Sequence, residues 1–375
     1  MRTFIIFLRI FAGRSHTTVT RLLTAMDTPK KNTDKPKERL LWIDWMKSIG
    51  IYLIVLGHFF PCGSKYIYTF SVPLFFLVTG FLSKREADLR VFRRKLWYNL
   101  VLPMLLISAL NFMLVSASAL VKGTFCIRDL LLFPIMTAAG FHSGLGCMWF
   151  VYTIIVLKLI QQFAPRRRWC DAALFIGLPL LGIWIDRHPI VMGHDIVQMS
   201  NAIINATVAY PFFISGVYLR RWEAAISRRC HPVVEVLCLV ACMAVVAICA
   251  SLNGNVWMFV NGYGKNFLLF LLGGYAGTVG VLIVSKWMRD FWSASIVTIS
   301  TGTIIILGFH YYVINIIQKM GIDVPMLDYV FAALIVIAFI PIIRFTEKHF
   351  PYLIGKYRVQ SAAIRTRDAV LTSGF

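Results

Sequence analysis

Long apolar stretches alternate with short polar stretches along most of the chain. Each apolar stretch has about 17–24 residues, which is near the length that an α-helix needs to cross a bilayer. The pattern predicts about ten such helices, at residues 41–60, 66–83, 97–120, 147–164, 172–186, 201–219, 233–251, 266–285, 294–317 and 327–344. We therefore predict an all-α polytopic membrane protein.

The basic residues gather in alternate loops between these segments. They lie at 83–95, 165–168, 220–229, 286–289 and in the C-terminal tail. Because loops rich in Lys and Arg stay in the cytoplasm, this distribution predicts that both termini are cytoplasmic. The remaining loops at 121–146, 186–200 and 252–265 are aromatic and polar, and we expect them outside.

The pattern divides the chain into three parts. Residues 1–40 form a polar and basic N-terminal tail, residues 41–345 the membrane domain, and residues 346–375 a basic cytoplasmic tail. Residues 1–25 contain no acidic residue, whereas an ordinary polar tail follows Met26. A transit peptide has this composition, but we favour an over-called start codon, and the predicted fold does not include residues 1–25.

Composition narrows the classes of partner. The net charge is +21, but 58% of the residues are hydrophobic, so we assign the basic residues to loops that meet a lipid bilayer and not to nucleic acid. The eight cysteines show no CxxC pair and no metal-ligand spacing. We therefore expect packing cysteines, no disulfide framework and no metal.

Three ionisable residues stand out within the first apolar segment: Asp44, Lys47 and His58. Charged groups are costly in hydrocarbon and tend to be functional there. At about 100° per residue, the three lie on one helix face within roughly 60° of each other. Lys47 and His58 are about 16 Å apart along the axis. Asp44 and Lys47, three positions apart, can form an ion pair.

Several segments carry a family resemblance. The spacing D-x-x-K-x10-H from Asp44 to His58, followed by VPLFFLVTGF at 72–81, resembles membrane-bound acyltransferase family 3. MWFVYTIIV at 148–156, YPFFISGVYL at 210–219 and ILGFHYYVI at 306–314 resemble later helices of that family. Within it, the first helix is most similar to the fucose 4-O-acetylase-like branch.

This resemblance implies an enzyme of the bacterial inner membrane with ten helices. It would move an acetyl or other acyl group from acetyl-CoA to a hydroxyl of a surface carbohydrate or of its lipid-linked precursor. Many members carry Arg where Lys47 stands. Lysine keeps the charge but lacks the bidentate fork.

Each candidate site residue has a functional and a structural interpretation. His58 is either the general base that activates an acceptor hydroxyl or a helix-end histidine that meets water. Lys47 either contacts a phosphate or carbonyl of the acyl donor, oriented by Asp44, or extends to the inner interface as an anchor. His310 either completes the catalytic site or hydrogen-bonds between helices.

Other polar and aromatic residues receive structural interpretations. Trp149 and Phe150 fit packing better than chemistry, and Lys158 fits an interfacial anchor. An outer metal site is disfavoured because the spacing of its candidate ligands matches no standard pattern; these are Asp186, His188, His194 and Asp195.

A transporter or flippase of a lipid-linked sugar is the alternative function. Transporters are commonly built from repeated halves and carry more charge within the membrane. We find no internal repeat and little such charge, so the enzyme remains the preferred hypothesis.

Overall fold

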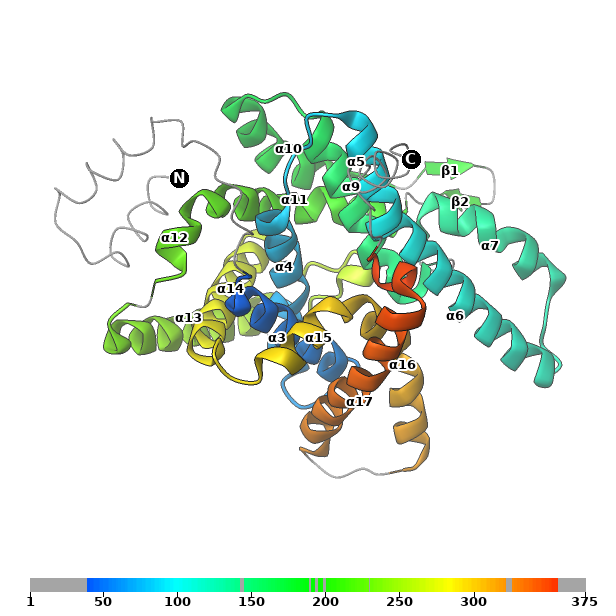
Figure 1. Ribbon diagram of the computed structural model, residues 1–375. Coiled ribbons are helices and arrows are strands. Elements are labelled where there is room, and N and C mark those ends of the chain that lie inside the picture. Colours follow the sequence, from blue (N-terminus) through cyan, green and yellow to red (C-terminus); the bar gives the residue numbers. More distant parts are fainter. Residues whose placement is uncertain are drawn as a thin grey trace, which may run out of the picture.

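The computed structural model describes residues 39–141, 145–188, 190–192, 195–197, 200–228, 230–321 and 326–356. Most of the N-terminal tail, residues 357–375, His142 and His194 lie outside this range. The described chain is almost entirely helical (Figure 1).

One set of helices corresponds to the predicted apolar segments, with the segment 294–317 divided between two helices. They are α3 (Leu41–Gly57), α4 (Ser64–Leu82), α6 (Leu102–Val121), α9 (Trp149–Phe163), α10 (Arg168–Arg187), α11 (Asn201–Leu219), α13 (Pro232–Asn253), α14 (Phe267–Met288), α15 (Ser293–Thr301), α16 (Thr303–Lys319) and α17 (Leu327–His349). The remaining elements are α5 (Leu89–Leu96), the π-helix η1 (Trp97–Val101), α7 (Ile127–Ala139), the 3₁₀ turns η2 (Gly146–Met148), η3 (Arg220–Trp222), η4 (Met258–Val260) and η5 (Pro351–Ile354), α12 (Glu223–Ile226), and the antiparallel strands β1 (Ile190–Met192) and β2 (Asp195–Val197).

Eight helices of the described chain are long and apolar enough to cross a membrane, or nine if the bent pair α15–α16 is one span. The first predicted segment is α3, whose 17 residues are close to the shortest length that spans hydrocarbon, about 17. The all-helical architecture is thus confirmed, with eight or nine helices in the described chain that could span a membrane, whereas the count of ten and the location of the termini stay predictions.

The predicted segment 294–317 is broken. Helices α15 and α16 meet at 81° around Gly302. A Cβ added at Gly302 would lie 2.4 Å from the Ile343 side chain of α17, so a glycine permits the close approach that the bend requires. The bend exposes the last carbonyls of α15, including that of Ser300, to the side of α3.

The predicted outer loop at 121–146 contains an additional helix, α7. It lies beside α6 (Figure 1), and the rings of Phe112 and Phe133 stack at 4.1 Å between centroids. Pro134 lies inside α7. The helix has only 13 residues, so it is too short to stand out as a membrane-spanning apolar segment.

Close packing of α4 against α11 forms the centre of the bundle. A Cβ at Gly80 would lie 1.9 Å from the Phe213 carbonyl oxygen, and one at Gly216 would lie 2.0 Å from that of Leu77. Small residues let the two backbones approach in this way, as is common between membrane helices. Helix α3 packs on α4 and also contacts α14, α15, α16 and α17, so its polar residues face several neighbours at once.

Candidate active site

His58 lies where α3 ends. The residue is the C-cap of the helix; Phe60 then takes a positive φ of 54°, and Pro61 follows it. Proline is common just beyond a helix because it cannot continue one. The end of the helix therefore holds the imidazole half-buried at the rim of the bundle, with Nδ1 2.7 Å from the Ile54 carbonyl oxygen.

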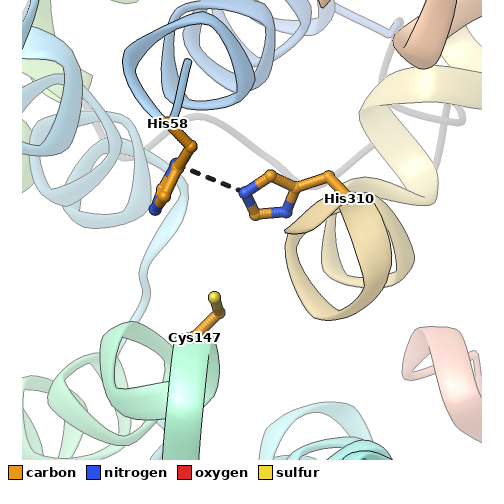
Figure 2. Close-up of side chains that lie close together, drawn as sticks. All are labelled: His58, Cys147 and His310. Carbon is orange, nitrogen blue, oxygen red and sulfur yellow. Dashed lines mark hydrogen bonds between the residues drawn. The ribbon is translucent and has the colours of Figure 1, made fainter. Parts of the chain in front are cut away.

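His310 of α16 meets His58 directly. Its Nε2 lies 3.3 Å from Nδ1 of His58, and the rings are edge to face at 4.8 Å between centroids (Figure 2). His310 is completely buried. Its Nδ1 lies 2.8 Å from the Ile306 carbonyl oxygen and 3.0 Å from that of Leu307.

These contacts assign the ring protons. A ring nitrogen beside a carbonyl oxygen must carry the hydrogen, so both Nδ1 atoms are N–H donors. Nε2 of His310 is then an acceptor, and the single Nδ1–H of His58 is shared between it and the Ile54 carbonyl oxygen. Nε2 of His58 is left with its lone pair and, within the described chain, with no hydrogen-bond partner; Figure 2 shows it pointing away from His310. The arrangement leaves one basic nitrogen available to a substrate.

A cysteine joins the two histidines, and sequence reasoning missed it. Cys147, in the turn η2 before α9, places Sγ in a group with His58 and His310 whose ligand-type atoms all lie within 4.8 Å of one another (Figure 2). Among the described residues, this is the only group of three or more His, Cys, Asp or Glu side chains that a metal ion could bridge. That the site needs no metal stays a prediction. In the sequence, the only feature that could have indicated a role for Cys147 is its position immediately before the family-like segment 148–156.

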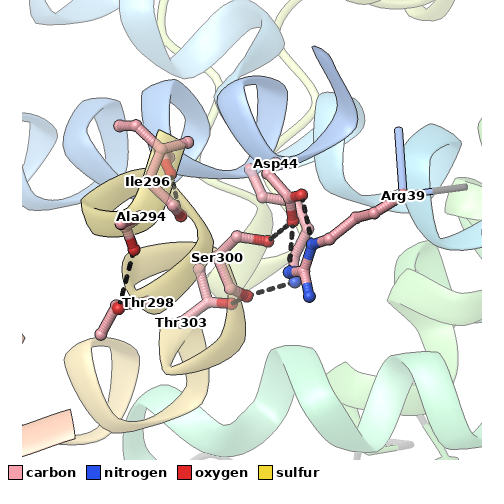
Figure 3. Close-up of polar contacts among 9 residues, drawn as sticks. Arg39, Asp44, Ala294, Ile296, Thr298, Ser300 and Thr303 are labelled. Carbon is pink, nitrogen blue, oxygen red and sulfur yellow. Dashed lines mark hydrogen bonds and ion pairs between the residues drawn. The ribbon is translucent and has the colours of Figure 1, made fainter. Parts of the chain in front are cut away.

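A second polar cluster lies near the other end of α3 (Figure 3). The buried carboxylate of Asp44 accepts two hydrogen bonds from the guanidinium of Arg39, at 2.7 and 2.8 Å, and one from Oγ of Ser300 at 2.6 Å. Nζ of Lys47 donates to the Ser300 carbonyl oxygen, which the bend at Gly302 exposes. The cluster holds two cations and one anion, so it is net positive.

The ion pair that the spacing allowed between Asp44 and Lys47 is not formed. Asp44 pairs with Arg39, whose planar guanidinium fits both carboxylate oxygens. Ser300 connects the two residues of α3 instead, through its hydroxyl to Asp44 and its carbonyl to Lys47. Asp44 therefore does not orient Lys47 through a direct contact. The two side chains are connected through Ser300 of α15.

The remaining candidates take structural positions. Trp149 and Phe150 are buried, and Phe150 packs on the rings of Phe75 and Phe76. Nζ of Lys158 donates to Oγ of Ser83 at 2.8 Å.

The two described candidates for an outer metal site, which the sequence disfavoured, have other partners. Asp186 accepts from Nδ2 of Asn261 at 2.9 Å, and the ring of His188 stacks on Trp184. His194 lies outside the described residues, and the side chain of Asp195 is not among those described.

Comparison with known proteins adds one finding. The family model Acyl_transf_3, described as an acyltransferase domain, matches residues 40–345. No curated protein and no solved structure matches the chain. The matched range contains both polar clusters of α3 except Arg39.

Proposed function

The chain belongs to the acyltransferase 3 family, and from this premise we propose that it is an integral-membrane O-acetyltransferase that moves an acetyl group from acetyl-CoA to a hydroxyl of a surface carbohydrate or of its lipid-linked precursor. The fucose 4-O-acetylase-like branch is the proposed subgroup. Ten spans, cytoplasmic termini and residence in a bacterial inner membrane complete the proposal.

The contacts of His58 carry this function, because they engage Nδ1 and leave Nε2 without a hydrogen-bond partner in the described chain. A hydroxyl is a weak nucleophile at neutral pH, and a neutral imidazole within hydrogen-bond reach can take its proton as the oxygen attacks. The Nδ1–H bond to Ile54 holds the required tautomer. His310 is too deeply buried to meet substrate, so we assign it the positioning of the His58 ring.

Aromatic surface beside His58 supports a carbohydrate acceptor. The ring of Tyr311 is 6.2 Å from that of His58 between centroids, and 46% of the residue is exposed. An exposed aromatic face is a suitable platform for the C–H face of a sugar ring. A sugar lying on Tyr311 would lie next to the ring of His58.

The positive cluster near the other end of α3 supports a polyanionic donor. Nζ of Lys47 has three N–H groups, of which one meets Ser300. The remaining two are available to a carbonyl or phosphate oxygen of acetyl-CoA. Lys47 and His58 are separated by about 16 Å along α3, a distance that the extended pantetheine arm of CoA can cover. The donor thioester would then reach His58 while the anionic head stays near Lys47.

Transfer of radiolabelled acetyl groups tests this function. Membranes that contain the protein, incubated with [¹⁴C]acetyl-CoA, should incorporate label into extractable glycan or glycolipid. Membranes that contain the His58→Ala variant at equal abundance should not. Equal incorporation by both membranes would contradict the assignment, and a lack of incorporation together with sugar translocation would favour a flippase.

A further inference from the structure

Cys147 brings a thiol to the histidine pair. It enters through η2, a turn separate from the helices that carry His58 and His310, and Figure 2 shows its Sγ directed toward the space beside the two rings. Cys147 and His58 are half-buried, whereas His310 is fully buried. Cys147 and His58 are therefore the two members of the group that keep some exposed surface.

One polar atom on each of these two side chains has no partner in the described chain. Cys147 is a free cysteine, and neither its Sγ nor Nε2 of His58 has a hydrogen-bond partner there. By contrast, the polar atoms that hold the site together are all engaged: Nδ1 of His58 with Ile54, and Nδ1 of His310 with Ile306 and Leu307. A thiol beside an imidazole with a free lone pair is the pairing that cysteine nucleophiles use.

We propose that Cys147 carries the acetyl group from donor to acceptor as a covalent thioester. This role rests on the acetyltransferase function proposed above and specifies its mechanism. Transfer then takes two steps, and the donor and the acceptor use the same basic nitrogen in turn.

The first step exchanges one thioester for another. Nε2 of His58 takes the proton of the Cys147 thiol, and Sγ attacks the carbonyl carbon of acetyl-CoA. The Sγ–C bond forms, the bond from that carbon to the CoA sulfur breaks, and the CoA sulfur receives the proton from the imidazolium. No oxidant or reductant is needed, and a thioester of similar energy replaces the first.

The second step forms the ester. Nε2 of His58, neutral again, takes the proton of the acceptor hydroxyl while its oxygen attacks the carbonyl carbon of acetyl-Cys147. The O–C bond forms, the C–Sγ bond breaks, and Sγ regains the proton from the imidazolium. The enzyme returns to its starting state. An approach of Sγ to Nε2 closer than in the free protein is expected on substrate binding, as is usual for catalytic hydrogen bonds.

A covalent intermediate predicts an exchange reaction that needs no acceptor. The purified full-length protein in lipid nanodiscs, given acetyl-CoA and ¹⁴C-labelled free CoA, should move label into acetyl-CoA. Peptide mass spectrometry after incubation with acetyl-CoA alone should find one acetyl group on Cys147, removable by neutral hydroxylamine. Direct transfer from donor to acceptor gives neither result. Both measurements use the unaltered protein and so do not depend on the folding of a variant.

Variants then assign the exchange to the thiol. Cys147→Ala should lose exchange by at least about 100-fold, in the range expected for removal of a catalytic group, whereas Cys170→Ala, which alters a buried cysteine of α10, should retain it. Cys147→Ser, close in size to the native residue, provides a second variant should alanine disturb folding.

The outcomes separate this mechanism from the function on which it rests. Glycan acetylation by the wild type without exchange, or exchange that persists in Cys147→Ala, would overturn the covalent role and leave the acetyltransferase function in place. A wild type that transfers acetyl groups to neither glycan nor itself would overturn both.

Discussion

Nε2 of His310 lies 3.3 Å from Nδ1 of His58, although 252 positions separate the two residues in the chain. The contact turns two isolated histidines of different helices into one unit. Because His310 is buried and bound to backbone carbonyls, it holds the ring of His58 from behind and leaves Nε2 of His58 for substrate.

Removal of the basic nitrogen should abolish acetyl transfer. We expect His58→Ala to lower the rate of glycan acetylation by about 10² to 10⁴, the usual effect of losing a general base, while the protein still inserts and accumulates. Quantitative immunoblotting of membranes controls for abundance. Acetylation near the wild-type level would show that His58 has only a structural role.

Loss of the supporting histidine should have a smaller effect. In His310→Ala the ring of His58 keeps its bond to Ile54 but loses its second contact. A misplaced catalytic group can cost about 10²-fold in rate, so we expect a decrease in kcat up to that size with little change in the KM for acetyl-CoA. An equal rise in KM would indicate a disturbed donor site and contradict a role confined to positioning.

The charge of Lys47 should matter more than its shape. If it contacts the donor, Lys47→Met should lose about 1.5–3 kcal/mol, or roughly 10- to 150-fold in donor affinity or rate, and Lys47→Arg should keep measurable activity. Lys158→Met removes a lysine bonded to Ser83 and serves as the control. Kinetics with varied acetyl-CoA measure the effect; an unchanged Lys47→Met would make Lys47 an interfacial anchor.

Substitution of Gly80 should destabilise the bundle. A Cβ there would lie 1.9 Å from the Phe213 carbonyl oxygen, and because backbone cannot move aside cheaply, we expect Gly80→Ala to cost about 1–3 kcal/mol or more. Gly177→Ala is the matched control, since a Cβ at that helical glycine meets nothing within 4 Å. Thermal unfolding in detergent, followed by size-exclusion chromatography, should show a lower midpoint for Gly80→Ala alone. Equal midpoints would contradict the close α4–α11 contact.

Native cysteines report the topology. The charge distribution places Cys62 and Cys126 outside and Cys230 in the cytoplasm, and the first two are exposed. A membrane-impermeant thiol reagent applied to intact cells should therefore label Cys62 and Cys126, and should label Cys230 only after the membrane is opened. A cysteine introduced at residues 83–95 should behave like Cys230. Labelling of either cytoplasmic position from outside would overturn the ten-span arrangement.

The sequence by itself predicted the helical membrane class, most of the segments and the polar face of α3. These features are local: the length of an apolar run, the period of the helix, and the cost of placing Asp44, Lys47 and His58 in hydrocarbon all act within one segment. His310 also emerged as a candidate, through the family-like segment at 306–314.

The tertiary structure decided what these residues contact. The pairing of His58 with His310, the approach of Cys147 and the link from Asp44 through Ser300 to Lys47 join segments that are distant along the chain. The bend at Gly302 depends on the close approach of α17. Helical periodicity states which face of a segment is polar but not which helix will cover it, since that is settled by the packing of complete side chains between helices.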